Sequence, residues 1–132
     1  MSPRVLVVDD EPTIRSVLVR ALQMYGYEPF TAATADSAHR VLEEREVDAV
    51  LLDVRLTDLP GDVLYYALVR RWPYLRGRIV FMSGDLTQAP DTWPHELLAC
   101  PRLPKPFHIT DLMDLLGRIA VPEASRRRSN GG

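Results

Sequence analysis

VLVVDDEP, residues 5–12, joins four apolar residues directly to three acids and a proline. The four apolar residues, all Val or Leu, are typical of a strand that is buried on both faces of a sheet. Pro12 favours the first turn of a helix, which would begin directly after the acids. The stretch therefore places three carboxylates between a buried strand and a helix, where uncompensated negative charge is costly.

The rest of the chain repeats this alternation of strand and helix. Apolar runs predict strands at residues 4–8, 27–32, 49–52, 78–82 and 101–103. Apolar residues spaced three and four apart predict helices that begin at Pro12, after Thr34, after Gly61, within 92–98 and at Ile109. Five strands that alternate with five helices predict right-handed crossovers, and hence an α/β fold with a parallel sheet covered by helices on both faces.

Polar residues follow four of the predicted strands at the point where each strand ends. Asp9 and Asp10 follow the first strand, and Asp53 follows the third. Ser83 follows the fourth strand, and Lys105 comes shortly after the fifth. Because sites in such folds lie beyond the carboxyl ends of the strands, we expect these side chains to meet at one edge of the sheet.

The three aspartates of this edge predict a metal site. An acid near a helix N-terminus is stabilised by only about 0.3–1 kcal/mol. Two carboxylates about 4 Å apart repel by roughly 4 kcal/mol at an effective dielectric constant near 20, and a third increases the cost. Helix capping cannot offset that repulsion, but a bound cation can. Ligands that are all oxygen favour a hard ion, so we expect Mg²⁺.

Mg²⁺, a carboxylate, a hydroxyl and an ammonium together suit phosphoryl transfer, which depends on positioning and on positive charge around the transferred group. Asp53 would be the nucleophile and would form an aspartyl phosphate. The ion would neutralise one phosphoryl oxygen, Lys105 a second, and the Ser83 hydroxyl with nearby backbone N–H groups a third.

Four motifs in this order resemble the receiver domain of two-component response regulators: VVDDEP, AVLLDVRL, SGD after RIVFM, and LPKPF. The resemblance covers about residues 4–120. It implies a flavodoxin-like sheet of strand order 2-1-3-4-5 and phosphorylation of Asp53 by the phosphohistidine of a partner. It also implies that Asp10, Asp53 and the Arg55 carbonyl bind Mg²⁺, with Asp9 bound through water, and that the Lys105–Pro106 peptide is cis.

The chain departs from the family at Arg102, where receivers usually have an aromatic residue that turns inward on phosphorylation. Arg102 is either a solvated strand residue or a switch that moves toward an acid such as Asp85 when the phosphoryl group arrives. Arg55 and Asp85 lie two residues beyond Asp53 and Ser83, at positions that resemble those controlling water access. They would either pair and lengthen the phosphorylated lifetime, or be independent solvated side chains.

The composition of the chain indicates the cellular environment and the extent of this domain. One cysteine, Cys100, excludes an internal disulfide and favours a reducing cytoplasm. No apolar run approaches the roughly 18 residues of a membrane span. We expect a receiver domain at 1–120 and a disordered basic tail at 121–132, whose three arginines more often form a solvated terminus than a nucleic-acid contact.

The leading functional hypothesis is a phosphoacceptor switch, not an enzyme, supplied by a histidine kinase or a histidine phosphotransfer protein. We expect no output domain after residue 120, so that output would be protein binding through helix four, strand five and helix five, with a homodimer possible on phosphorylation. A free-standing regulator and the receiver of a hybrid histidine kinase both fit. The alternatives are an interaction module that is never phosphorylated, a phosphate-ester hydrolase with an aspartate nucleophile, and a flavodoxin-like cofactor binder. The adjacent acids would repel the phosphate of such a cofactor.

Overall fold

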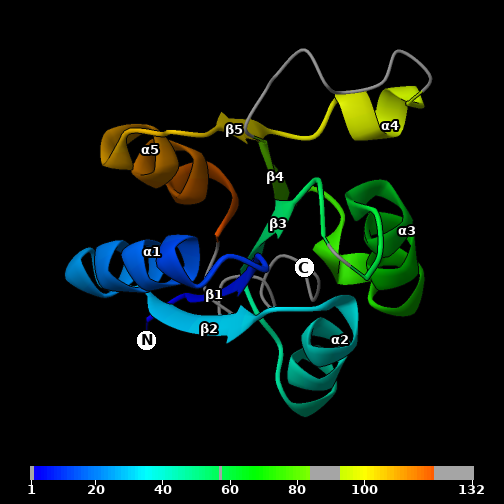
Figure 1. Ribbon diagram of the computed structural model, residues 1–132, viewed down its shortest axis with the longest axis horizontal. Helices are drawn as coiled ribbons and strands as arrows, with labels where there is room; N and C mark the ends of the chain where they lie inside the picture. The colour runs from blue at the N-terminus through cyan, green and yellow to red at the C-terminus, as the bar shows by residue number, and fades with distance from the viewer. Residues whose placement is uncertain (1, 57, 84–92, 121–132) are drawn as a thin grey trace, which may run out of the picture.

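The computed structural model describes residues 2–56, 58–83 and 93–120. Five parallel strands form one sheet in the order β2-β1-β3-β4-β5, which confirms the expected topology (Figure 1). The strands are β1 (Arg4–Val8), β2 (Glu28–Ala32), β3 (Ala49–Asp53), β4 (Ile79–Ser83) and β5 (Arg102–Pro104). All but β1 differ from the predicted ranges by one residue at one or both ends, which is within the usual uncertainty of a boundary.

Helices cover both faces of this sheet (Figure 1). They are α1 (Pro12–Met24), α2 (Ala35–Glu44), α3 (Gly61–Arg71), α4 (His95–Leu98) and α5 (Ile109–Ile119), and a 3-10 turn, η1 (Pro73–Leu75), follows α3. Helix α4 is shorter than the predicted 92–98. Pro94 is its N-cap, and a residue that precedes a proline is disfavoured in the helical conformation, so the helix begins after Pro94. None of the helices in the described ranges is long and apolar enough to cross a membrane.

Two hydrophobic clusters lie on opposite sides of the sheet, because successive side chains of a strand alternate between its faces. In β1, Leu6 and Val8 pack against α2 and α3, whereas Val5 and Val7 pack against α1 and α5. All five residues of β3 and of β4 are buried. The central strands are therefore rigid supports for the residues that follow them.

The register of the strands brings their carboxyl ends together. Val8 of β1 lies beside Leu52 of β3, and Asp53 lies beside Met82 of β4. Ser83 pairs with Pro104, and the Lys105 N–H donates to the Ser83 carbonyl oxygen over 2.6 Å. The sheet thus places the predicted polar residues at one edge.

Candidate functional site

Three aspartates meet at the carboxyl edge of the sheet. Asp9 and Asp53 are buried, and Asp10 is half-buried. One carboxylate oxygen from each residue lies within 4.8 Å of the others. This arrangement fits Mg²⁺, because the donors are hard oxygen atoms that converge from two adjacent strands.

Asp9 is fixed at both its backbone and its side chain. Its N–H donates to the carbonyl oxygen of Ala32 in β2 over 3.1 Å. Its Oδ1 accepts the Glu11 N–H over 2.9 Å, and its Oδ2 accepts Lys105 Nζ over 2.7 Å. Its carbonyl oxygen accepts Nη1 of Arg15, on the first turns of α1, over 2.7 Å. The peptide that links Asp9 to its acidic neighbour therefore has little freedom to rotate.

Lys105 supplies the positive charge of the site. Its Nζ also lies 3.6 Å from Oδ2 of Asp53, so that one ammonium bridges two buried carboxylates. Burial alone would lower the pKa of Lys105. The hydrogen bond to Asp9 and the charges of Asp53, Asp9 and Glu11 outweigh burial and raise that pKa. Lys105 is therefore protonated at neutral pH. The Lys105–Pro106 peptide is cis, as the family resemblance implied.

Asp53 has a raised pKa. Burial is the largest cause, and the charges of Asp9 and Asp10 act in the same direction. The hydrogen bond from the Arg55 N–H to Oδ1, over 3.0 Å, and the charge of Lys105 lower the pKa but do not cancel the rise. The ionised form of Asp53 is thus destabilised in the folded protein unless a cation is bound nearby.

This raised pKa predicts how stability depends on pH. Folded Asp53 binds its proton more tightly than unfolded Asp53, so the free energy of unfolding falls as pH rises from the ordinary pKa of 3.8 to the raised value. The Asp53→Asn variant lacks this loss. In EDTA it is expected to be more stable than the wild type at neutral pH and equal to it below about pH 4, as urea unfolding at a series of pH values would measure. A constant difference at all pH values would contradict the assignment.

The loop after β3 is held close to Asp53. Besides the Arg55 N–H contact, Arg55 forms an antiparallel bridge with Pro60, and the Gly61 N–H donates to the Val54 carbonyl oxygen over 2.9 Å. The Arg55 side chain is exposed. Its backbone, by contrast, is fixed next to the acidic cluster, which is where a carbonyl ligand would be needed.

Ser83 and Arg102 are the remaining predicted site residues that the structure describes. Ser83 is buried at the end of β4, at the same edge as the acids. Arg102 is half-buried in β5, and its Nη2 donates to the Leu98 carbonyl oxygen at the end of α4 over 3.4 Å. Asp85, its expected partner, lies outside the described residues. Whether Arg102 moves on phosphorylation stays a prediction.

Sequence reasoning missed Arg15 at this site. Its guanidinium reaches the Asp9 carbonyl oxygen because α1 begins directly after the acids, which places its first turns over the end of β1. A basic residue on the first turns of a helix that follows a strand-end acid is the signal that could have found it.

Known proteins resemble this chain in sequence over most of its length. Residues 5–117 match the family model described as the response regulator receiver domain. The chain is 33% identical over 126 residues to the DNA-binding transcriptional regulator NtrC of a Bradyrhizobium species, covering 96% of this chain and 26% of that protein. It is 36% identical over 116 residues to sensor kinase CckA of Brucella abortus, covering 84% of this chain and 12% of that protein.

A solved structure shares the fold over nearly its whole length. The response regulator protein TrrA of Thermotoga maritima, in complex with Mg²⁺-BeF, superposes with a TM-score of 0.76 and 26% sequence identity. The alignment covers 88% of this chain and 97% of that one. The chain spans about a quarter or less of the length of the two curated relatives named above.

Proposed function

Because the chain belongs to the response regulator receiver domain family, we propose that it is a signalling switch that accepts a phosphoryl group on Asp53. Receiver domains are phosphoacceptor signalling domains and not enzymes that turn over a separate substrate. The observation that supports the proposal most strongly is the buried Asp53 carboxylate, which lies 3.6 Å from Lys105 Nζ and beside two further aspartates.

In the proposed reaction, an Asp53 carboxylate oxygen attacks the phosphorus atom of a partner's phosphohistidine. The new O–P bond forms as the N–P bond breaks, and the electron pair of that bond remains on the histidine nitrogen. Lys105 would contact one phosphoryl oxygen through its ammonium, and the Ser83 hydroxyl would contact another. The hydrogen bond from the Arg55 N–H to Oδ1 orients the carboxylate so that Oδ2 is the oxygen available for attack.

Asp10, Asp53 and the Arg55 carbonyl would bind Mg²⁺, and Asp9 would orient a water molecule bound to it. When bound, the ion supplies positive charge to a phosphoryl oxygen. The same charge would offset the repulsion among the three carboxylates. The solved complex of TrrA with Mg²⁺-BeF supports the choice of ion.

The partners follow from the same proposal. A histidine kinase or a histidine phosphotransfer protein would supply the phosphoryl group, in a cytoplasmic setting. Output would be a change in protein binding through α4, β5 and α5, and a homodimer could form there on phosphorylation. The chain covers 26% of NtrC and 12% of the sensor kinase CckA, so the resemblance to both fits a receiver that is joined to further segments, such as a kinase. A free-standing regulator is the other candidate.

Incubation with acetyl phosphate and Mg²⁺ tests the function directly. The protein is expected to gain the mass of one phosphoryl group, and EDTA is expected to prevent the gain. If the protein gains no mass but still binds a histidine kinase or a histidine phosphotransfer protein, the result would support an interaction module that is never phosphorylated. Continuous hydrolysis of assorted phosphate esters would support a hydrolase instead.

The exposed side chain of Arg55 is proposed to slow the loss of the phosphoryl group by hindering water, in concert with Asp85. Arg55→Ala is expected to shorten the phosphorylated half-life by up to about fivefold, since an exposed charge pair contributes about 0–1 kcal/mol. The half-life would be measured from the decay of the phosphorylated mass after acetyl phosphate is removed. Arg40→Ala, which removes an exposed arginine from α2, is the control, and an unchanged Arg55→Ala half-life would exclude the role.

A further inference from the structure

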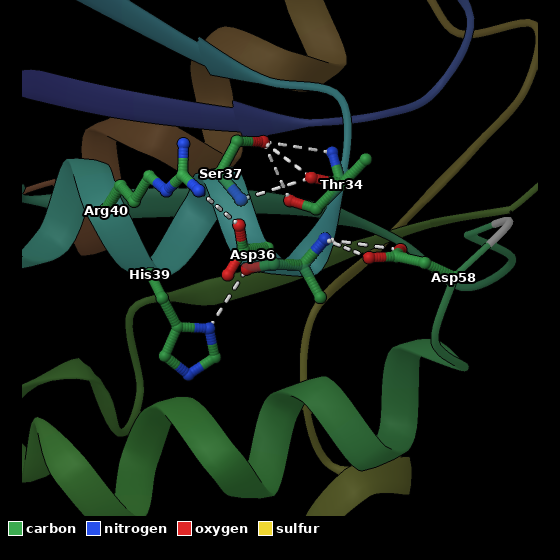
Figure 2. A network of polar contacts seen from close by, with 7 residues as sticks. Thr34, Asp36, Ser37, His39, Arg40 and Asp58 are labelled. Carbon is green, nitrogen blue, oxygen red and sulfur yellow. Dashed lines mark hydrogen bonds and ion pairs between the residues drawn. The ribbon is translucent and has the colours of Figure 1, made fainter.

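Asp58 joins the loop after the phosphoacceptor strand to a neighbouring helix. The N–H of Ala35, the first residue of α2, donates to both carboxylate oxygens of Asp58, over 3.2 Å to Oδ1 and 3.0 Å to Oδ2. Figure 2 shows this contact, with Asp58 approaching the end of α2 from the loop that follows β3. The two residues are 23 positions apart, and the contact connects the loop after β3 with the first residue of α2.

The same helix end has a second, local cap. Thr34 Oγ1 accepts the Ser37 N–H over 3.1 Å, and Ser37 Oγ accepts the Thr34 N–H over 3.1 Å, which together form a capping box. Both caps satisfy backbone N–H groups that the helix itself leaves without a partner. They differ in one respect: Thr34 belongs to the segment that enters α2, whereas Asp58 belongs to the loop that follows Asp53.

That loop contains the proposed carbonyl ligand of the metal. Asp58 lies three residues beyond Arg55 and two residues before Pro60, the two ends of the antiparallel bridge. The bridge between Arg55 and Pro60 fixes the base of the loop, and the Asp58 contact fixes its tip to the first residue of α2. Leu56 and Leu59 of the loop also pack on the core cluster, but the Asp58 contact is the polar link between the tip and α2. Without it, the Arg55 peptide would gain freedom.

We propose that Asp58 is a positioning residue that raises the affinity of the site for Mg²⁺ by holding the loop, and with it the Arg55 carbonyl, in its binding geometry. The proposal rests on the proposed function, because it takes that carbonyl as a ligand. Residues that orient metal ligands from outside the coordination sphere commonly change affinity by 10–100-fold. Asp58 acts through a short stretch of backbone, so a smaller effect of about threefold to tenfold is expected.

A matched pair of variants separates positioning from helix capping. Asp58→Ala and Thr34→Ala each remove one cap from the same helix end, so both are expected to lower the Tm by a few degrees. Isothermal titration calorimetry with MgCl₂ should show the dissociation constant raised about threefold to tenfold in Asp58→Ala and changed less than about twofold in Thr34→Ala. Asp58→Asn keeps a carbonyl oxygen for the Ala35 N–H and is expected to bind Mg²⁺ within about twofold of the wild type.

A second measurement needs no metal. In EDTA, the Arg55 N–H, which donates to Asp53, is expected to exchange with solvent faster in Asp58→Ala than in Thr34→Ala. Asp36→Asn removes a charge from the first turn of the same helix without touching the loop, and it controls for electrostatic effects on Mg²⁺ binding.

Equal dissociation constants and equal Arg55 exchange in Asp58→Ala and Thr34→Ala would overturn the proposal. It would also be overturned if Asp58→Asn or Asp36→Asn lost as much affinity as Asp58→Ala, because charge would then explain the effect. A wild-type protein that binds no Mg²⁺ and accepts no phosphoryl group would instead refute the proposed function, and the exchange of the Arg55 N–H would still test whether Asp58 holds the loop.

Discussion

Asp53→Asn is expected to gain no phosphoryl group from acetyl phosphate and Mg²⁺, so that its intact mass stays that of the untreated protein. Asparagine keeps an acceptor for the Arg55 N–H, which now reaches Oδ1 over 3.0 Å, and so the local fold should survive. It lacks the anionic oxygen that attacks phosphorus. Circular dichroism and urea unfolding would establish that the variant is folded, so that the loss reports on chemistry alone.

The control for this substitution is Asp114→Asn, which changes an exposed aspartate of α5 by the same atoms. It should be phosphorylated at the wild-type rate. Peptide mapping of the phosphorylated wild type should find the label on Asp53. A label on Asp9 or Asp10, or a persistent mass gain in Asp53→Asn, would show that another carboxylate is the acceptor.

Gly61→Ala is expected to be the most damaging single-methyl change near the site. A Cβ at residue 61 would lie 2.8 Å from the Asp53 carbonyl oxygen and 2.8 Å and 2.9 Å from Cα and the carbonyl oxygen of Val54. All three atoms belong to the backbone, so no side chain can rotate away. Such overpacking costs about 1–3 kcal/mol, which corresponds to a fall in Tm of roughly 4–12 °C for a domain of this size.

The strain of Gly61→Ala falls on the peptide that links Asp53 to the metal-binding loop. We therefore expect a weaker Mg²⁺ affinity and slower phosphorylation in addition to the lower Tm, measured by calorimetric titration and by intact mass against time. Gly117→Ala is the matched control, because a Cβ there meets no atom within 4 Å. Residue 117 is inside α5, where replacing glycine by alanine is expected to raise the free energy of unfolding by about 0.5–1 kcal/mol. Equal behaviour of the two variants would contradict the steric argument.

Most of the site could be predicted from the sequence because it depends on strand ends. Apolar runs identify β1, β3 and β4, and parallel strands necessarily end at the same edge. The positions of Asp9, Asp53 and Lys105 follow from that rule. The order of the strands and the cis peptide before Pro106 do not follow from any local pattern, and they were expected only because of the family resemblance.

Contacts between loops could not be predicted in the same way. The Asp58–Ala35 hydrogen bonds depend on how the two loops meet above the sheet, and a sequence in which Asp58 lies between Thr57 and Leu59 indicates only a turn. The contact of Arg102 with the Leu98 carbonyl oxygen is similar, because it depends on the place where a four-residue helix ends. Hydrophobic periodicity predicts neither of these two contacts.

The ion pair between Lys105 and Asp9 has a consequence for the order in which the molecule is completed. The two residues are 96 positions apart, whereas both neighbours of β1 in the sheet, β2 and β3, lie within the first 53 residues. A nascent chain that paused after β3 would lack the ammonium that balances the charge of Asp9 in the complete fold. The ribosome must release nearly the whole domain before this charge is balanced, so a truncated product that ends before β5 would lack a finished acceptor pocket.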